Sequence, residues 1–338
     1  MSTTIATRVT VCADDGTPLA AWTFGPATAS VTVVFVHGHC LRTESWWFLR
    51  DELLRQWGSD TRMVFYDHRG HGDSAGADPA TYTIDQLGHD LDAVLRAVAP
   101  TGPVVLVGHS MGAMVVLAYA RLFPATIGTR VVGVGLIAGA AADITAVGLG
   151  RLLNRHTVTS LRVAVQRAPR ALQVSKRLGR RVFEPMVREA SFGSRRVNPR
   201  MAALATAMLN DTPLPTMAYF LDSLIRFDET PTLRLLSDLP ALVLGGSADI
   251  MIPFAHSVVL AAQLGRSELV RLDGAGHSVI LERAAEVAVA VAALVARALG
   301  TSAGTSESRP AVTAVLPVLA PLGEVEPPSV TATLPAAG

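Results

Sequence analysis

Ser110 has the sequence context best suited to nucleophilic chemistry, inside the run VVLVGHSMGAM of residues 104–114. Residues 104–107 are bulky and apolar, which predicts a buried strand, and residues 111–119 (MGAMVVLAY) predict a helix packed on it. A strand that turns directly into a helix must crowd its backbone, and glycine tolerates that crowding. The pattern Gly-x-Ser-x-Gly at this junction therefore predicts a sharp turn that exposes the serine hydroxyl as a nucleophile.

A serine hydroxyl needs a base to take its proton, and the base needs an orienting carboxylate. His277 is the predicted base, because it lies in the glycine-rich loop DGAGHS after the last predicted strand. Asp249, in the loop GGSAD after the preceding predicted strand, is the predicted carboxylate, and Asp143 is the alternative acid. Loops at the carboxyl ends of parallel strands open on one face, so Ser110 and His277 are expected to meet there.

Other interpretations of these residues stay open in the sequence. Asp249 is also placed to shape the turn before Pro253, which suits the first position of a helix. His256 is interpreted as a helix-surface residue, and His109 as a side chain that points away from the active face.

The elements that must position these residues alternate between strands and helices. This alternation predicts an α/β fold with a mostly parallel central sheet flanked by helices on both faces. A hairpin around Asp14-Asp15-Gly16 is expected at one edge of the sheet. The predicted strands are 7–12, 18–24, 31–36, 62–66, 104–107, 130–137, 240–244 and 268–272, and the predicted helices are 44–56, 82–98, 111–119, 253–264 and 279–299.

Two segments differ from this pattern. Residues 141–235 contain helical patterns without a convincing strand, which predicts a helical cap (lid) inserted into a core of residues 1–140 and 236–300. Residues 301–338 are rich in Pro, Ala, Thr and Ser and are expected to form a disordered tail.

Composition sets limits on partners and compartment. The net charge of +1 predicts no nucleic-acid partner, and the oligomeric state is left open. Cys12 and Cys40 give no disulfide framework, the polar start has no signal-peptide pattern, and the apolar stretches are too short to span a membrane. A cytoplasmic location is therefore expected. Metal-binding clusters and phosphate-binding glycine motifs are missing from the sequence, so no metal and no cofactor are expected.

Several motifs together resemble the α/β-hydrolase fold family, in its capped branch of serine esterases and haloperoxidase-like enzymes. The chain order Ser110, Asp249, His277 is that of the family. The resemblance covers roughly residues 15–300 and includes HGHC at 37–40, DHRGHGDS at 67–74, GSAD at 246–249 and GAGH at 274–277. Ala113 is a departure, because many relatives carry a third glycine there.

The resemblance also implies further site residues. The family uses two backbone N–H groups as an oxyanion hole, which implies Met111 and His39 here. Met111 begins a predicted helix, whose free N–H groups favour developing negative charge. Trp46 and Trp47 follow the oxyanion loop and are candidates for a substrate pocket, with packing on the core as the alternative. Arg69, with its flanking glycines, is interpreted as part of a structural turn.

A serine at the turn indicates attack on a carbonyl, whereas the related epoxide hydrolases and haloalkane dehalogenases use an aspartate there. The predicted function is hydrolysis of small or medium apolar carboxylic esters through an acyl-enzyme. A carbon–carbon-bond hydrolase and a cofactor-free haloperoxidase or perhydrolase are alternatives on the same triad. A slow-turnover ligand receptor and a membrane-surface binding protein are alternatives of another class.

The predicted cap is strongly basic. Between Arg151 and Arg226 it contains 13 arginines and one lysine against four acidic residues. Leucines and valines alternate with the arginines, which predicts an amphipathic helix with its charged face outward. That face is either a solvated surface or a site of peripheral contact with anionic lipid.

Overall fold

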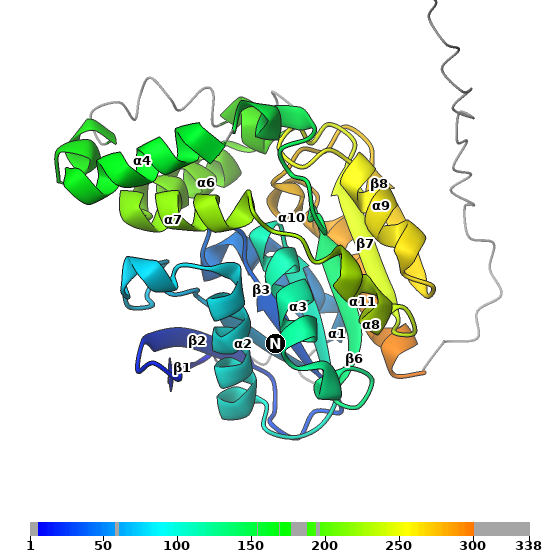
Figure 1. Ribbon diagram of the computed structural model, residues 1–338. Helices are drawn as coiled ribbons and strands as arrows, with labels where there is room; N and C mark the ends of the chain where they lie inside the picture. The colour runs from blue at the N-terminus through cyan, green and yellow to red at the C-terminus, as the bar shows by residue number, and fades with distance from the viewer. Residues whose placement is uncertain are drawn as a thin grey trace, which may run out of the picture. The chain divides into compact units, whose positions relative to one another are not determined.

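The structure is a computed structural model that describes residues 6–57, 61–153, 155–168, 170–176, 188–193 and 197–300. Within these residues, one 8-stranded sheet has the spatial order β1-β2-β4-β3-β5-β6-β7-β8 (Figure 1). The strands are β1 (Thr7–Cys12), β2 (Pro18–Phe24), β3 (Thr32–Val36), β4 (Arg62–Tyr66), β5 (Val104–His109), β6 (Val131–Ile137), β7 (Ala241–Gly246) and β8 (Ser267–Leu272).

The sheet is parallel from β4 to β8 and antiparallel at one edge. β3 pairs in parallel with β4 and β5, and β5, β6, β7 and β8 continue the parallel ladder. The hairpin β1–β2 joins this ladder through an antiparallel pairing of β2 with β4. The predicted fold class, a mostly parallel sheet flanked by helices with a hairpin at its edge, is confirmed.

Helices cover both faces of the sheet, which explains why every residue of β3 and β5 is buried and most of them are apolar. Side chains of α2, α3, α8 and α9 pack on one face, and those of α1, α10 and α11 pack on the other. The bounds are α1 (Trp47–Trp57), α2 (Ile84–Val98), α3 (Met111–Leu122), α8 (Leu233–Leu236), α9 (Ala255–Gln263), α10 (Val279–Glu282) and α11 (Ala284–Ala298).

Between β6 and β7 the chain forms an insertion of helices, shown at the top of Figure 1. Its main helices are α4 (Arg155–Arg167), α6 (Pro199–Asp211) and α7 (Leu214–Leu224), and α4 is preceded by a 3₁₀ turn, η4 (Gly148–Leu152). The two ends of the insertion meet, because the Glu229 N–H donates to the Ala141 carbonyl at 2.8 Å. Lys176, the single lysine of the chain, caps α6 by donating to the carbonyls of Leu209, Asn210 and Thr212.

The C-terminal helix differs from its prediction. Instead of one helix over 279–299, α10 ends at Glu282 and α11 begins at Ala284, because Arg283 (φ −131°, ψ 41°) leaves the helical conformation. The break frees Glu282 to bind the loop that carries His277. The predicted tail at 301–338 lies outside the described residues. None of the helices in the described residues is both long and apolar enough to cross a membrane.

Candidate active site

Ser110 stands on a strained turn between β5 and α3. Its φ of 53° lies in the left-handed region, where a non-glycine residue is uncommon. Gly108 and Gly112 flank this serine, and they are needed because a side chain at either position would clash with the backbone, not because of their φ angles. A Cβ at Gly108 would lie 2.3 Å from the Gly112 carbonyl oxygen, and one at Gly112 would lie 1.9 Å from the Val36 carbonyl oxygen. The pattern Gly-x-Ser-x-Gly therefore reflects close backbone packing around a serine that points out of the sheet.

The structure brings Ser110, His277 and Asp249 into one hydrogen-bonded chain. His277 Nε2 lies 2.9 Å from Ser110 Oγ, and His277 Nδ1 lies 2.7 Å from Asp249 Oδ2. A carboxylate accepts hydrogen bonds, so Nδ1 carries the proton and Nε2 is the acceptor for the serine hydroxyl. The alternative acid, Asp143, is exposed, and no hydrogen bond joins it to His277 in the described part of the chain.

Asp249 has two structural tasks at once. Its Oδ2 faces His277, while its Oδ1 accepts the N–H groups of Met251 and Ile252, each at 2.9 Å. The two sequence interpretations of Asp249, as an orienting carboxylate and as a turn-forming residue, are therefore compatible. The turn fixes the carboxylate, whose side chain is 1% exposed, in the orientation that faces the imidazole.

Two backbone N–H groups lie beside the serine. Met111 is the first residue of α3, and His39 lies in the loop after β3. Within the described residues neither N–H has an intramolecular acceptor. An unpaired N–H at a helix N-terminus favours an anion because its hydrogen points away from the helix and the helix dipole is positive there.

The loop that carries His39 is held by a second loop after β4. Cys40, at a φ of 59°, donates its N–H to His71 Nε2 at 3.2 Å. Asp67 Oδ1 accepts the N–H of Thr43 at 2.7 Å, and its Oδ2 accepts the N–H of Asp73. A Cβ at Gly72 would lie 2.0 Å from Asp67 Oδ2, so glycine is needed there. The motif DHRGHGDS thus supports the loop that carries His39, whereas its sequence indicated only a structural turn.

Four histidines in and below these loops are almost fully buried: His37, His68, His71 and His109. Burial lowers the pKa of His37 to about 4 and that of His109 to about 3, and it lowers the pKa of His68 and His71 well below the usual value. Hydrogen bonds require neutral rings as well. His37 Nε2 accepts the His68 N–H at 3.0 Å, and His71 Nε2 accepts the Cys40 N–H, which a protonated ring could not do.

His109 differs from its sequence interpretation as a residue that points away from the active face. It lines the cavity at Ser110, and its Nε2 lies 2.9 Å from the carbonyl oxygen of His277. Because a carbonyl only accepts, His109 is the donor. This bond ties the residue before Ser110 to the backbone of His277, the predicted base.

A second support for the His277 loop comes from Glu282, which the sequence did not single out. Its Oε2 accepts the N–H of Gly276 at 2.9 Å and that of Gly193, in the insertion, at 3.2 Å. The Ser278 N–H also donates to the Ser191 carbonyl at 2.7 Å. The loop with the base and the inserted segment are therefore packed as one unit.

A cavity of about 300 Å³ opens at Ser110 and His277. Apart from the polar groups described above, its walls are mostly aliphatic. The loop side includes Leu41, and the insertion contributes Ala205 and Leu209 of α6 together with Met217 and Leu221 of α7. Met251, next to Asp249, forms part of the rim.

The expected pocket residues Trp46 and Trp47 do not line this cavity. Trp46 is buried in the core, with its ring centroid 5.3 Å from that of Phe35. Trp47 is exposed and lies by a separate depression near Phe24 and Arg50. The alternative interpretation, packing on the core, describes Trp46. Trp46 ends the 3₁₀ turn η1 (Thr43–Trp46) and Trp47 begins α1, so these two consecutive side chains lie in different environments.

The described residues contain no group of three or more His, Cys, Asp or Glu side chains that could hold a metal ion. A mostly parallel sheet with a serine at the turn after β5, a carboxylate after β7 and a histidine after the last strand, β8, defines the α/β-hydrolase class. The chain belongs to the alpha/beta hydrolase family, whose model matches residues 33–291.

Solved structures of this fold are similar to the chain at low identity. An esterase from Thermogutta terrifontis, 23% identical, aligns with a TM-score of 0.70 over 87% of this chain and 99% of its own. An enol-lactonase from Burkholderia xenovorans, 21% identical, aligns with a TM-score of 0.68 over 85% and 99%. A bromoperoxidase from Bacillus anthracis, 18% identical, aligns with a TM-score of 0.68 over 86% and 99%. At such low sequence identity these structural alignments show the shared fold alone. Membership of the family supports a hydrolase as the general kind of enzyme.

Proposed function

We propose that this protein is a serine hydrolase that cleaves carboxylic esters of small or medium apolar acyl groups. The observation that carries the proposal is the hydrogen-bonded chain Ser110–His277–Asp249 at the floor of an apolar cavity. Serine attacks carbonyl carbon, and the aliphatic walls suit the hydrocarbon part of an acyl group. No cofactor is needed for this chemistry.

The steps of ester hydrolysis follow from the protonation of His277, whose Nδ1 carries a proton while Nε2 is free to accept one. His277 Nε2 takes the proton of Ser110 Oγ as the oxygen attacks the ester carbonyl, and Asp249 stabilises the imidazolium. The oxyanion accepts hydrogen bonds from the N–H groups of Met111 and His39. His277 then protonates the leaving alcohol, which departs and leaves an acyl-enzyme. Water attacks this ester by the same route, releasing the acid and the free serine.

The insertion, residues 141–235, serves in this proposal as the cap that selects the acyl group. Its helices α6 and α7 supply most of the aliphatic wall opposite the serine. A cavity of about 300 Å³ is at the lower limit of ordinary small-molecule sites, which favours short or medium acyl chains. Cys12 and Cys40 are both free thiols, which supports a reducing, cytoplasmic compartment.

The test is labelling with a fluorophosphonate followed by peptide mapping, combined with a series of p-nitrophenyl esters of increasing chain length. The label should be found on Ser110, and Ser110→Ala should lower kcat by roughly 10⁴–10⁶-fold. Ser191→Ala is the matched control, because Ser191 lines the same cavity without a hydrogen bond from its hydroxyl to His277.

Label on another residue, or a Ser110→Ala variant with a tenth of the wild-type activity, would refute the assignment. Labelling without turnover of any ester would instead indicate a receptor that retains the triad. Adding hydrogen peroxide to the ester assay measures perhydrolysis, and a carbon–carbon substrate such as a β-diketone measures the other alternative chemistry on the same residues.

A further inference from the structure

The surface beside the cavity combines exposed apolar side chains with arginines that have no ion pair among the described residues. Val147, Leu149 and Leu152 of η4 and its preceding residue, with Ile250 and Met251 after β7, are all large, apolar and exposed. Leu152 is 74% exposed, the highest value among the large apolar side chains of the described residues. These five residues are called the mouth patch below.

The mouth patch is continuous with the active-site cavity. The Leu149 N–H donates to the Ile250 carbonyl at 2.7 Å, which joins η4 to the segment after Asp249. Gly148, at a φ of 66°, lies so close to Ile250 that a Cβ would approach its carbonyl oxygen to 2.5 Å. Met251 lines the cavity itself. Through Met251, the mouth patch therefore adjoins the cavity that contains Ser110.

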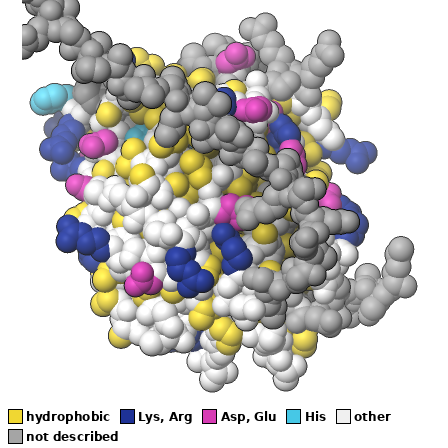
Figure 2. Space-filling model, turned by 90° about the vertical axis from the view of Figure 1, so that its right-hand side faces the viewer, with side chains coloured by type: hydrophobic (Ala, Val, Ile, Leu, Met, Phe, Trp, Pro, Cys, Tyr) yellow, Lys and Arg dark blue, Asp and Glu magenta, His cyan; other side chains and the backbone are white. Residues whose placement is uncertain are grey.

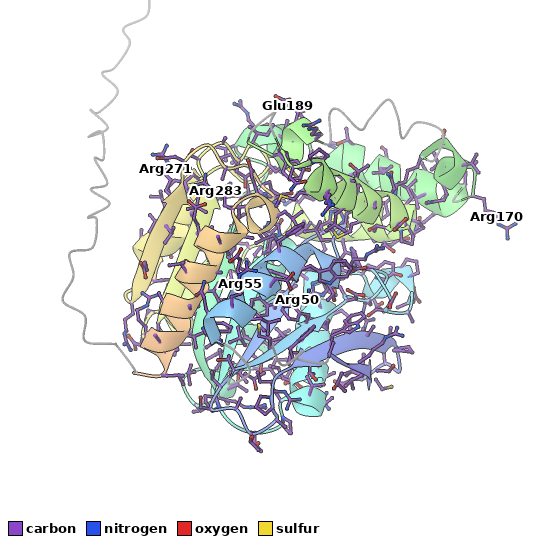
Figure 3. All side chains as sticks on the ribbon, turned by 180° about the vertical axis from the view of Figure 1, so that it is seen from behind. Arg50, Arg55, Arg170, Glu189, Arg271 and Arg283 are labelled. Carbon is purple, nitrogen blue, oxygen red and sulfur yellow. The ribbon has the colours of Figure 1, made fainter. Side chains whose placement is uncertain are left out.

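Positive charge follows the patch along the chain. Residues 144–176 contain five arginines and one lysine without an acidic residue. Arg162 pairs with Asp222 at 2.9 Å. By contrast, Arg151, Arg155, Arg167 and Arg170 make no ion pair with any described residue. Figure 3 shows Arg170 projecting away from the rest of the molecule at the outer end of the insertion.

The positive charge beside the mouth patch distinguishes between two possible partners, a second copy of the chain and a lipid bilayer. A second copy of the chain, docked through the same face, would bring unpaired arginines against arginines, which is unfavourable. A bilayer with anionic headgroups complements both features, since it accepts apolar side chains at the acyl boundary and cations at the headgroups.

We propose that the mouth patch, with Arg151 and Arg155 beside it, is a docking surface for anionic lipid bilayers. The protein lies on the bilayer with η4 inserted at the interface and the mouth of the cavity facing the lipid. The docking surface stands without the catalytic assignment, and only its use to collect acyl substrates from the bilayer rests on the proposed function.

The experiment measures binding directly, by co-sedimentation of the full-length protein with vesicles. One set is pure phosphatidylcholine, the other contains phosphatidylglycerol as well, and both are examined at low and high salt. We expect binding to the anionic vesicles that weakens with salt, and little binding to the neutral ones. Because turnover is not the readout, a failure of the proposed ester chemistry would leave this result unaffected.

Matched variants locate the surface. Leu152→Ser should weaken the partition onto anionic vesicles by about tenfold, and Arg151→Ser by about fivefold. The dipeptide Arg234-Leu235 on α8 is the control, because it is also exposed and lies on a helix that packs on α3. Leu235→Ser and Arg234→Ser should bind like the wild type.

Three results would overturn the proposal. The first is the absence of binding to anionic vesicles at low salt. The second is an equal loss of binding from the α8 variants, which would indicate nonspecific adsorption. The third is a change of oligomeric state on gel filtration by Leu152→Ser with unchanged vesicle binding, which would make the mouth patch a protein interface.

Discussion

The loops at the carboxyl edge of the sheet and the helical insertion above them differ in whether their charged side chains are buried and paired. At the loops, charged groups are buried and paired: Arg69, in the loop after β4, and Asp90, on α2, are both fully buried and joined by two hydrogen bonds. In the insertion, Arg151 and Arg155 are exposed and have no ion pair with a described residue. On the face of the core that carries α9 and β8, charges of both signs are interspersed (Figure 2).

This difference matches what each region has to do in the proposed function. Proton transfer from Ser110 to His277, with Asp249 orienting the imidazole, tolerates little change in distance, so the loops are fixed by buried hydrogen bonds. Helices α6 and α7 of the insertion present an apolar wall, whose shape can vary without moving the triad. Substitutions in the loops should therefore change rate and stability strongly, whereas substitutions in α6 and α7 should change selectivity.

The largest expected effect is that of Asp249→Asn on turnover. Its amide nitrogen would donate to His277 Nδ1, which leaves the proton on Nε2 and prevents Nε2 from accepting the Ser110 proton. We expect kcat to fall by about 10⁴. The change is measured by steady-state kinetics with a p-nitrophenyl ester, with circular dichroism to verify the fold.

Asp143→Asn is the matched control, because Asp143 is an exposed acid at the end of the neighbouring strand β6. It should keep wild-type kcat. A larger loss from Asp143→Asn than from Asp249→Asn would transfer the role of acid to the earlier strand.

The second effect concerns stability. Asp90→Asn leaves the guanidinium of Arg69 buried with only Asp15 as a charged partner, at 2.7 Å. Removing one member of a buried ion pair is costly, so the free energy of unfolding should fall by about 3 kcal/mol. Urea denaturation followed by circular dichroism measures this value.

An apolar replacement of the pair distinguishes charge from packing. Arg69→Met combined with Asp90→Leu removes both buried charges and should be less destabilising than Asp90→Asn alone. If the double variant is the less stable of the two, the pair contributes through its shape and the hydrogen bond from Arg69 to Thr81 rather than through balanced charge.

The sequence was sufficient for the fold and for the three residues that the structure brings together, because both depend on local signals. Alternation of strands and helices predicts the parallel sheet, and a serine between glycines at a strand–helix junction predicts the turn. The roles of His109 and Glu282 depend on contacts between segments far apart in the chain. His109 meets His277 across 168 positions, and Glu282 meets Gly193 across 89.

Trp46 and Trp47 are residues for which the sequence predicted a contact that the structure does not contain. Their proximity to His39 in the chain suggested a shared pocket, but a single 3₁₀ turn directs them to the core and to solvent. Closeness in the chain is therefore a poor guide to which residues share a pocket. Much of the cavity wall comes instead from α6 and α7, more than 90 positions after Ser110.

The third effect is acid instability of the loops. The pKa values of His37 and His109 are about 4 and about 3 in the folded chain, below the ordinary value of about 6.5. Between these limits the unfolded chain binds more protons, so the free energy of unfolding should fall as pH decreases from about 6.5 to about 4. His68 and His71 act in the same direction.

The slope of unfolding free energy against pH measures this effect, and each histidine contributes up to about 1.4 kcal/mol per pH unit. Burial raises the pKa of Asp67, which opposes the histidines and reduces the net slope. We expect a net uptake of more than one proton on unfolding near pH 5. An uptake below one proton would mean that these rings are not held neutral. The exposed His156 on α4 is the control, and His156→Gln should leave the slope unchanged.

The smallest effect is on selectivity, and it tests the insertion directly. Leu209 on α6 lines the cavity and is only partly buried, so Leu209→Ala should enlarge the site at little cost in stability. Longer acyl chains should then gain relative to short ones, by about tenfold in the ratio of their kcat/KM values, because each methylene that becomes accommodated contributes a small binding term. The Ser110–His277 geometry is unchanged by this substitution, so kcat for the shortest ester should stay near wild type.

Leu204→Ala is the matched control, since Leu204 lies on the same helix but packs against the core cluster under α1 and α11 rather than the cavity. An equal shift from both variants would mean that α6 acts through its stability, and a fall in kcat for every ester would mean that the insertion takes part in placing the catalytic groups as well as in selecting the acyl chain.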